Sequence, residues 1–372
     1  MNRLSSRDAT RILALAAAYA VTAAIGLRLG ATLHNTPPLW PAAGVALAAL
    51  CIGGIRLWPG VALGTLAIIA PRGNGALLTA AITVATTVEA VIGAWLLRRV
   101  FAFRPDLRRA RDASALVIAG GVAAPAIGAA IGAGAFAASG ALHAPLINEW
   151  FAWYLGDAMG ALLFAPAVLA WLARDTAAPD PRRQPLEVLS FVVGLTAATF
   201  AALGGLGLIV REDPPVIFIS FPFIVWGALR LGHRTTMGAL AVVALAASTA
   251  ASAHVGVFAG SATDVGALLQ AYLATAAATA LIVASFAAER RDANARLAES
   301  ERRLSLVHEA TTDQLALFAI HPAGVARLTF ANSAYVTALR TCEPSITETD
   351  VIGASTSAIA DRLGVEPTAM SF

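Results

Sequence analysis

Residues 150–166 read Trp-Phe-Ala-Trp-Tyr-Leu-Gly-Asp-Ala-Met-Gly-Ala-Leu-Leu-Phe-Ala-Pro, an apolar run that contains one carboxylate, Asp157. On a helix, Trp150, Trp153 and Asp157 share one face, because they follow one another at spacings of three and four residues. A charge near the centre of a membrane helix costs about 2.5–3.5 kcal/mol on insertion scales. Such a residue faces the interior of a helix bundle and needs a partner there.

Asp157 has two interpretations. It could make a structural hydrogen bond between two helices, or it could belong to a ligand site or a switch. The two tryptophans on its face favour the second interpretation. Gly156 and Gly160 form a small-xxx-small pair on the same segment, which lets a neighbouring helix approach closely.

The composition indicates a polytopic membrane protein. The chain has 372 residues, of which 58% are hydrophobic and only 13% are charged. Soluble domains carry roughly 25% charged residues. The net charge of +3 comes from loops beside apolar segments, so it does not indicate nucleic-acid binding. The two cysteines, Cys51 and Cys342, form no metal-binding pattern and no disulfide framework.

Ten apolar segments can be marked: 11–31, 40–55, 57–70, 75–99, 113–138, 147–173, 186–209, 216–231, 235–258 and 265–288. The second and third are short for a bilayer that needs about 20 residues per helix. They could be two tilted spans or one re-entrant pair. We therefore predict an all-α integral membrane bundle of 8–10 transmembrane helices over residues 1–288, surrounded by the lipid bilayer.

Arginines predict the orientation. With ten spans, most arginines lie before the first segment or after an even-numbered one, and these positions are all on the same side of the membrane. They are Arg3, Arg7, Arg11, Arg56, Arg98, Arg99, Arg104, Arg108, Arg109, Arg111, Arg174, Arg182, Arg183, Arg230, Arg234, Arg290 and Arg291. The other side has only Arg28, Arg72 and Arg211. The positive-inside rule places both termini in the cytoplasm.

The charged stretch 289–310 continues directly from the last apolar segment. Its residues Ala293, Leu297, Ser300, Leu304 and Val307 follow a 4-3-4-3 spacing, the seam of a coiled coil. We predict a short parallel coiled coil between two copies of the chain, and hence a homodimer. The alternative is a single solvated helix.

Residues 311–372 change character again. Residues 315–320 and 325–330 are predicted strands around a turn at 322–324, and Asn332 can cap a short helix through Leu339. This is an incomplete α+β fragment, too small to bury a core by itself. The chain looks cut inside a domain.

Three stretches together resemble the first class of membrane-associated sensor domain, the MASE family: Leu39–Gly44 continuing to Arg56–Gly60 and Gly64, Trp153–Asp157 with Gly160 and Pro166, and Phe221–Gly232. The resemblance covers roughly residues 10–290. It implies a sensory module of about eight spans in the bacterial inner membrane, preceding a histidine kinase, a diguanylate cyclase or a PAS domain. The tail resembles the start of a PAS domain in three stretches: Asp313–Ile320, Gly324–Tyr335 and Val351–Gly353. The resemblance implies signal transduction, for example in a two-component system, through an output domain that this chain lacks.

Further site candidates lie in other apolar segments. Glu89 lies midway along the fourth segment, at a depth similar to that of Asp157. Trp226 and Arg230 share a face of the eighth segment, and Arg230 could either pair with Asp157 or Glu89 or anchor the cytoplasmic end. Trp40, before Pro41, could anchor at the interface or line a cavity.

Glu149 is expected at the outer surface, either as a solvated residue or as a gate. The sequence contains no nucleophile–base set, phosphate loop or metal-ligand cluster. We therefore expect no enzyme activity from the chain as given and no cofactor. The expected partner is a small-molecule ligand or a membrane protein bound near the intramembrane carboxylates. The alternative function is a transporter or channel that uses these carboxylates.

Overall fold

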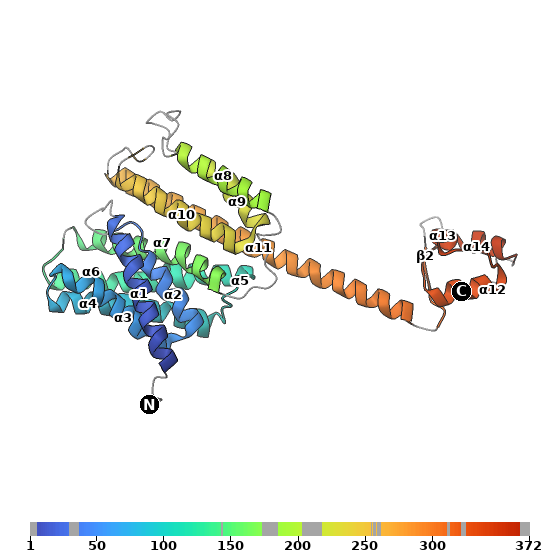
Figure 1. The fold of residues 1–372 in the computed structure, drawn as a ribbon, viewed down its shortest axis with the longest axis horizontal. Coiled ribbons are helices and arrows are strands. Elements are labelled where there is room, and N and C mark those ends of the chain that lie inside the picture. The colour runs from blue at the N-terminus through green and yellow to red at the C-terminus, as the bar shows by residue number, and fades with distance from the viewer. Residues whose placement is uncertain are drawn as a thin grey trace. The chain divides into compact units, whose positions relative to one another are not determined.

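The computed structural model describes residues 6–29, 37–142, 144–172, 185–202, 218–253, 255, 258, 262–310, 313–320 and 325–364. The chain forms two compact units, residues 1–290 and 291–372, and each is described by itself. The first is a bundle of helices and the second is a small α/β unit (Figure 1). The predicted fold class, an all-α membrane bundle with a small α+β fragment, is confirmed.

Every predicted apolar segment corresponds to a helix of the first unit. The helices are α1 (Ser6–Arg28), α2 (Pro41–Gly53), α3 (Trp58–Ile69), α4 (Ala76–Trp95), α5 (Ala110–Leu116), α6 (Ala124–Ala138), α7 (Leu146–Leu172), α8 (Pro185–Ala202), α9 (Phe221–Arg230), α10 (Gly232–Ser252) and α11 (Ala262–Ala310). A π-helical turn extends α4 through Val100, and another, Val117–Ala123, joins α5 to α6.

Six helices of the described residues are long and apolar enough to cross a membrane: Arg7–Arg28, Ala76–Val100, Ala110–Ala138, Leu146–Leu172, Gly232–Ser252 and Val265–Leu306. At 1.5 Å per residue, α2 and α3 extend only about 20 and 18 Å, less than the ~30 Å hydrocarbon core. The chain breaks between them at Gly54, whose φ of +96° favours glycine.

The short helix α2 lies at the centre of the bundle. It packs against α1, α4 and α7, and α10 packs against α7, α8 and α9 (Figure 1). Glycines allow the closest of these approaches. A Cβ at Gly160 of α7 would overlap the Trp40 carbonyl oxygen, and one at Gly156 would lie 2.7 Å from the Pro37 carbonyl oxygen. The predicted small-residue contact of α7 is therefore present, and its neighbour is the start of α2.

The helix α11 runs without a break for 49 residues. It begins inside the apolar bundle and continues through the charged stretch to Ala310, as the sequence predicts. The predicted continuity of this helix is confirmed.

The second unit contains the predicted hairpin. Strand β1 (Ala316–Ile320) pairs antiparallel with β2 (Ala326–Ala331), with a bulge between Leu317 and Phe318. The predicted turn at 322–324 lies outside the described residues. Asn332 caps α12 (Ser333–Cys342), as predicted, since its Oδ1 accepts the Tyr335 N–H at 2.9 Å.

One expectation for this unit was wrong. Two further helices, α13 (Glu348–Val351) and α14 (Thr356–Leu363), help to enclose a buried apolar cluster. The members of the cluster are Leu328, Ala331, Val336, Leu339, Ile346, Val351 and Ile359. This cluster is hard to recognise in the sequence because its residues are spread over several short elements, none of which is strongly periodic.

Candidate functional site

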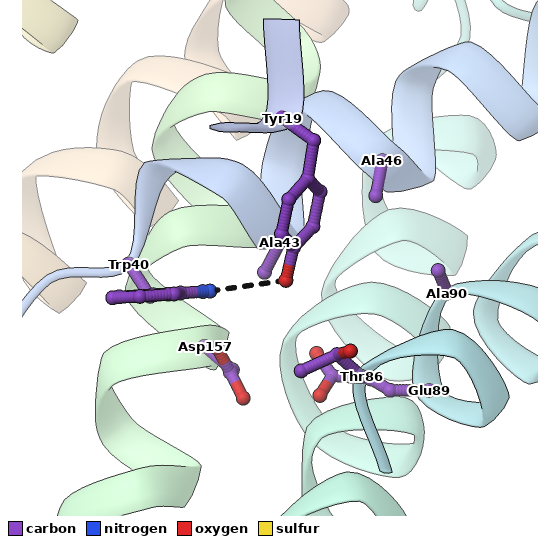
Figure 2. Close-up of a pocket in the computed structure, with 8 residues that line it drawn as sticks. All are labelled: Tyr19, Trp40, Ala43, Ala46, Thr86, Glu89, Ala90 and Asp157. Carbon is purple, nitrogen blue, oxygen red and sulfur yellow. Dashed lines mark hydrogen bonds between the residues drawn. The ribbon is translucent and has the colours of Figure 1, made fainter. Parts of the chain in front are cut away.

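Four helices converge on a small cavity inside the bundle (Figure 2). Its lining comes from α1, the start of α2, α4 and α7, through Tyr19, Trp40, Ala43, Ala46, Thr86, Glu89, Ala90 and Asp157. The volume open to the centre of a water molecule is about 10 Å³. This is room for about one water molecule.

Two carboxyl groups face each other across this cavity. Asp157 is 3% exposed and Glu89 is 6% exposed. Figure 2 shows both side chains pointing into the same space, where a hydrogen bond can form if one of them carries a proton. Asp157 Oδ2 is buried and has no hydrogen-bond partner among the described residues. The predicted similar depth of these two residues therefore corresponds to direct proximity.

Hydroxyl groups complete the polar part of the lining. The Trp40 indole N–H donates to the Tyr19 hydroxyl at 3.4 Å. Thr86 shares a hydrogen bond of 3.0 Å with Thr65 of α3, whose hydroxyl also donates to the Val61 carbonyl oxygen. These contacts hold the walls of the cavity in place around the two carboxyl groups.

The electrostatics of the cavity are unusual. Its lining, as far as the structure describes it, contains two carboxyl groups and no arginine, lysine or histidine. Two like charges about 4 Å apart repel by roughly 4 kcal/mol at an effective dielectric constant of 20, and each buried charge costs several kcal/mol in lost hydration. Two ionised carboxylates in this cavity would therefore destabilise the fold unless a bound species reduced their charge.

The local sequence explains how Trp40 reaches the cavity. Trp40 precedes α2 with φ −117° and ψ 83°, and Pro41 occupies the first helical position, where a missing N–H costs nothing. The Trp40 N–H donates to the Gly156 carbonyl oxygen at 3.0 Å. Of the two predicted roles for Trp40, the structure supports cavity lining. The missing side chain of Gly128 on α6 leaves room for Glu89, because a Cβ at Gly128 would overlap the Glu89 carboxyl group.

The tryptophans on the Asp157 face separate into two environments. Trp153 lies within hydrogen-bonding reach of Asp157, and its ring packs edge-on against Phe136 at 6.0 Å between centroids. Trp150 does not line the cavity. It donates to the Ala126 carbonyl oxygen at 3.2 Å and stacks on Tyr154.

Arg230 and Trp226 are outside the cavity. Arg230 Nε lies 2.8 Å from Glu187 Oε1 on α8, and the Trp226 indole N–H donates to the same oxygen at 3.3 Å. The Arg230 side chain is 61% exposed. The pairing with Asp157 or Glu89 is therefore not formed, because Glu187 is the nearby carboxylate.

Glu149 also differs from its predicted environment. It lies in the first turn of α7 and is 4% exposed, so the expectation of a solvated residue was wrong. The positive end of the helix dipole favours a carboxylate at this position. Glu149 is not among the residues that line the cavity.

Sequence reasoning missed two residues near the cavity. Tyr19 belongs to a buried stripe of α1 with Ile12, Leu15 and Ala23, and this helical spacing could have identified it. Gln270 of α11 donates from Nε2 to the Pro38 carbonyl oxygen at 2.6 Å, two residues before Trp40. An amide in an otherwise apolar segment was its only signal.

Comparison with known proteins identifies the bundle. The MASE1 family model matches residues 11–291 and thus covers most of the chain. MASE1 is a membrane sensory domain found in signalling proteins. No curated protein and no solved structure matches the chain significantly. With six candidate spans in its described part and a family match over more than half its length, this multi-pass membrane protein belongs to the MASE1 family.

Proposed function

We propose that the chain is the sensory and relay part of a bacterial inner-membrane receptor, with both termini in the cytoplasm. A stimulus acts at the cavity between α1, α2, α4 and α7. The helix α11 carries the change to a PAS-like unit and then to an output domain, such as a histidine kinase or a diguanylate cyclase. MASE1 membership supports the sensory role.

The observation that carries the relay is the contact between α11 and the edge of the cavity. Gln270 bonds to the Pro38 carbonyl oxygen at 2.6 Å, and Trp40, two residues later, lines the cavity. Gln270 Oε1 is buried with no hydrogen-bond partner among the described residues. A shift at the start of α2 therefore acts directly on α11.

A second set of bonds fastens α11 at the other end of the bundle. Ser285 donates to the Leu107 carbonyl oxygen at 2.9 Å and bonds to His233 of α10 at 3.1 Å. One turn later, Glu289 Oε2 accepts the Ala110 N–H at 3.0 Å. A rotation or displacement of α11 must break or rearrange these bonds. In this proposal they hold one position of the helix, and the stimulus favours a second position in which they are rearranged.

The exposed seam of α11 supports a homodimer through residues 289–310. Leu297 and Leu304 are 60% and 56% exposed on a stretch rich in charged residues. Leu306 is also 60% exposed and lies off this seam. Leucines seven residues apart on one helix face are the seam that a second copy covers in a parallel coiled coil. Paired α11 helices bring two output domains together.

Spin labelling at Cys342 tests this proposal. Cys342 is exposed and Cys51 is buried, so a label attaches at one position, and Cys51→Ala removes any residual labelling. Electron–electron distance measurements on the full chain in lipid nanodiscs should detect two labels from two copies. Asp157→Asn and Glu89→Gln should shift that distance, whereas Glu149→Gln should not.

Two outcomes contradict the proposal. If no distance between copies is detected, the homodimer is wrong. If all variants give the wild-type distance while remaining folded, the cavity does not act on the relay helix. Solute uptake by proteoliposomes that depends on Asp157 would instead support the transporter alternative, which the buried carboxyl pair favours.

A further inference from the structure

The cavity is too small for a small-molecule ligand of the kind expected from the sequence. Its open volume of about 10 Å³ accommodates about one water molecule. The walls are also fixed by backbone contacts, because α7 meets the start of α2 through Gly160 and the Trp40 carbonyl oxygen. A metabolite would have to separate these helices, whereas a proton or a single water molecule fits without any movement.

The groups that face the carboxyl pair do not neutralise it. The Tyr19 hydroxyl comes from α1, the Trp40 indole from the residue before α2, and the Thr86 hydroxyl from α4. Gly128 of α6 contacts Glu89 and offers no side chain. Trp153 of α7 lies within hydrogen-bonding reach of Asp157. None of these described groups carries a positive charge.

Asp157 Oδ2 is the second observation. This oxygen is buried and has no hydrogen-bond partner among the described residues. Asp157 as a whole is only 3% exposed. Buried carboxylate oxygens are normally hydrogen-bonded. An unpartnered oxygen beside a second carboxyl group is the arrangement that one shared proton completes.

We infer that Glu89 and Asp157 form a binding site for a single proton, which is the stimulus of this sensor. On binding, an O–H bond forms on one carboxyl oxygen, and the other carboxylate accepts a hydrogen bond from it. The pair then carries one negative charge instead of two. This inference rests on the proposed function only where it names the proton as the stimulus; the site itself stands on the cavity.

The position of the pair gives the proton site access to the relay. Glu89 and Asp157 lie about 20 and 16 Å along α4 and α7 from the first residues of these helices, counted at 1.5 Å per residue. Trp40 lines the same cavity, and Pro38 bonds to Gln270 of α11. Repulsion between two carboxylates pushes α4 and α7 apart, and a shared proton draws them together.

Infrared spectroscopy tests the site without depending on signalling. The full chain in lipid nanodiscs is titrated from acid to alkaline pH, and the carbonyl stretch of protonated carboxylic acid is followed. We expect a band in wild type that is absent from the double variant Glu89→Gln with Asp157→Asn. Each single variant should shift the band, because the remaining carboxyl group has lost its partner. Glu149 is a buried carboxylate of α7 that does not line the cavity, so the control variant Glu149→Gln should keep the wild-type band.

Three results overturn the inference. A wild-type spectrum identical to that of the folded double variant means that the pair holds no proton. A single variant that leaves the band unshifted means that the proton is not shared. A band that sodium chloride removes at constant pH, when choline chloride does not, means that a metal cation occupies the site.

The failure of the proposed relay gives a different result. If the infrared band behaves as expected but the distance between Cys342 labels is the same in wild type and the carboxyl variants, the proton site stands and the proposed relay is contradicted.

Discussion

Two pairs of ionisable side chains in this bundle differ in how their charges are compensated. Glu187 of α8 pairs at 2.8 Å with Arg230 of α9, whose side chain is 61% exposed to solvent. Glu89 and Asp157 face each other inside the bundle, and no cation lines their cavity in the described part of the chain. Exposed ion pairs contribute little to stability, whereas an uncompensated buried pair is costly. A protein retains such a cost where the pair has a function.

The largest expected effect concerns the walls of the carboxyl cavity. In Gly160→Ala, the added Cβ overlaps the Trp40 carbonyl oxygen, which is backbone and cannot turn aside. We expect destabilisation of about 1–3 kcal/mol from overpacking, measured by thermal unfolding in detergent. The matched control is Gly134→Ala on α6, where a Cβ meets nothing within 4 Å. Equal melting temperatures for the two variants would contradict the close contact of α7 with the start of α2.

The second prediction separates the two charged pairs. Asp157→Asn removes one of two buried like charges, so it should raise the stability of the bundle by on the order of 1–2 kcal/mol. Glu187→Gln removes one partner of an exposed ion pair and should leave the melting temperature close to that of wild type. Thermal unfolding of both variants provides the comparison. A loss of stability in Asp157→Asn that exceeds the loss in Glu187→Gln means that Asp157 has a structural role.

The third prediction disconnects the carboxyl pair from α11. Gln270→Leu removes the bond to the Pro38 carbonyl oxygen, and it also removes an amide oxygen that is buried without a partner among the described residues. These effects oppose each other, so stability should change by less than about 1 kcal/mol. The distance at Cys342 should no longer respond to Asp157→Asn, while the infrared band of the pair stays. A distance that still responds shows that the coupling follows another route.

The smallest effect lies in the second unit. Hydrogen bonds from the Thr347 hydroxyl and backbone N–H, together with Arg362, lower the pKa of Asp350 to about 2. The unfolded value is about 3.9. Because the folded pKa is the lower one, Asp350 stabilises the unit above about pH 4, and this contribution is lost as the pH falls toward 2. The protection factors of the amides in α13 and α14, which correct for the intrinsic pH dependence of exchange, should fall over this window in wild type and change less in Asp350→Asn. An equal fall in both chains would contradict this role.

The apolar segments and the continuity of α11 were predictable because they depend on local hydropathy and on helical spacing. The hairpin and the Asn332 cap were also predictable from short-range signals. The proximity of Glu89 and Asp157 could only be suggested by their similar depth, because the packing of α2 between α4 and α7 decides it.

Residues that act through backbone geometry were the hardest to predict. The bond from Gln270 to Pro38 joins positions 232 residues apart, and its acceptor is a carbonyl oxygen that every residue has. Arg230 was a plausible partner for Asp157 by charge alone, but the position of α8 brings Glu187 to it instead. In both cases the partner depends on helix packing, which the pattern of residue types does not encode.

The distance between Cys342 labels in two copies of the full chain, measured across a pH titration in nanodiscs, tests most directly whether the proton site drives the relay helix. We predict two distances in wild type whose populations exchange with pH, and a single pH-independent distance in the Glu89→Gln, Asp157→Asn double variant. A wild-type distance that stays constant over the pH range in which the infrared band of the pair changes would contradict the claim that this proton site drives the relay helix.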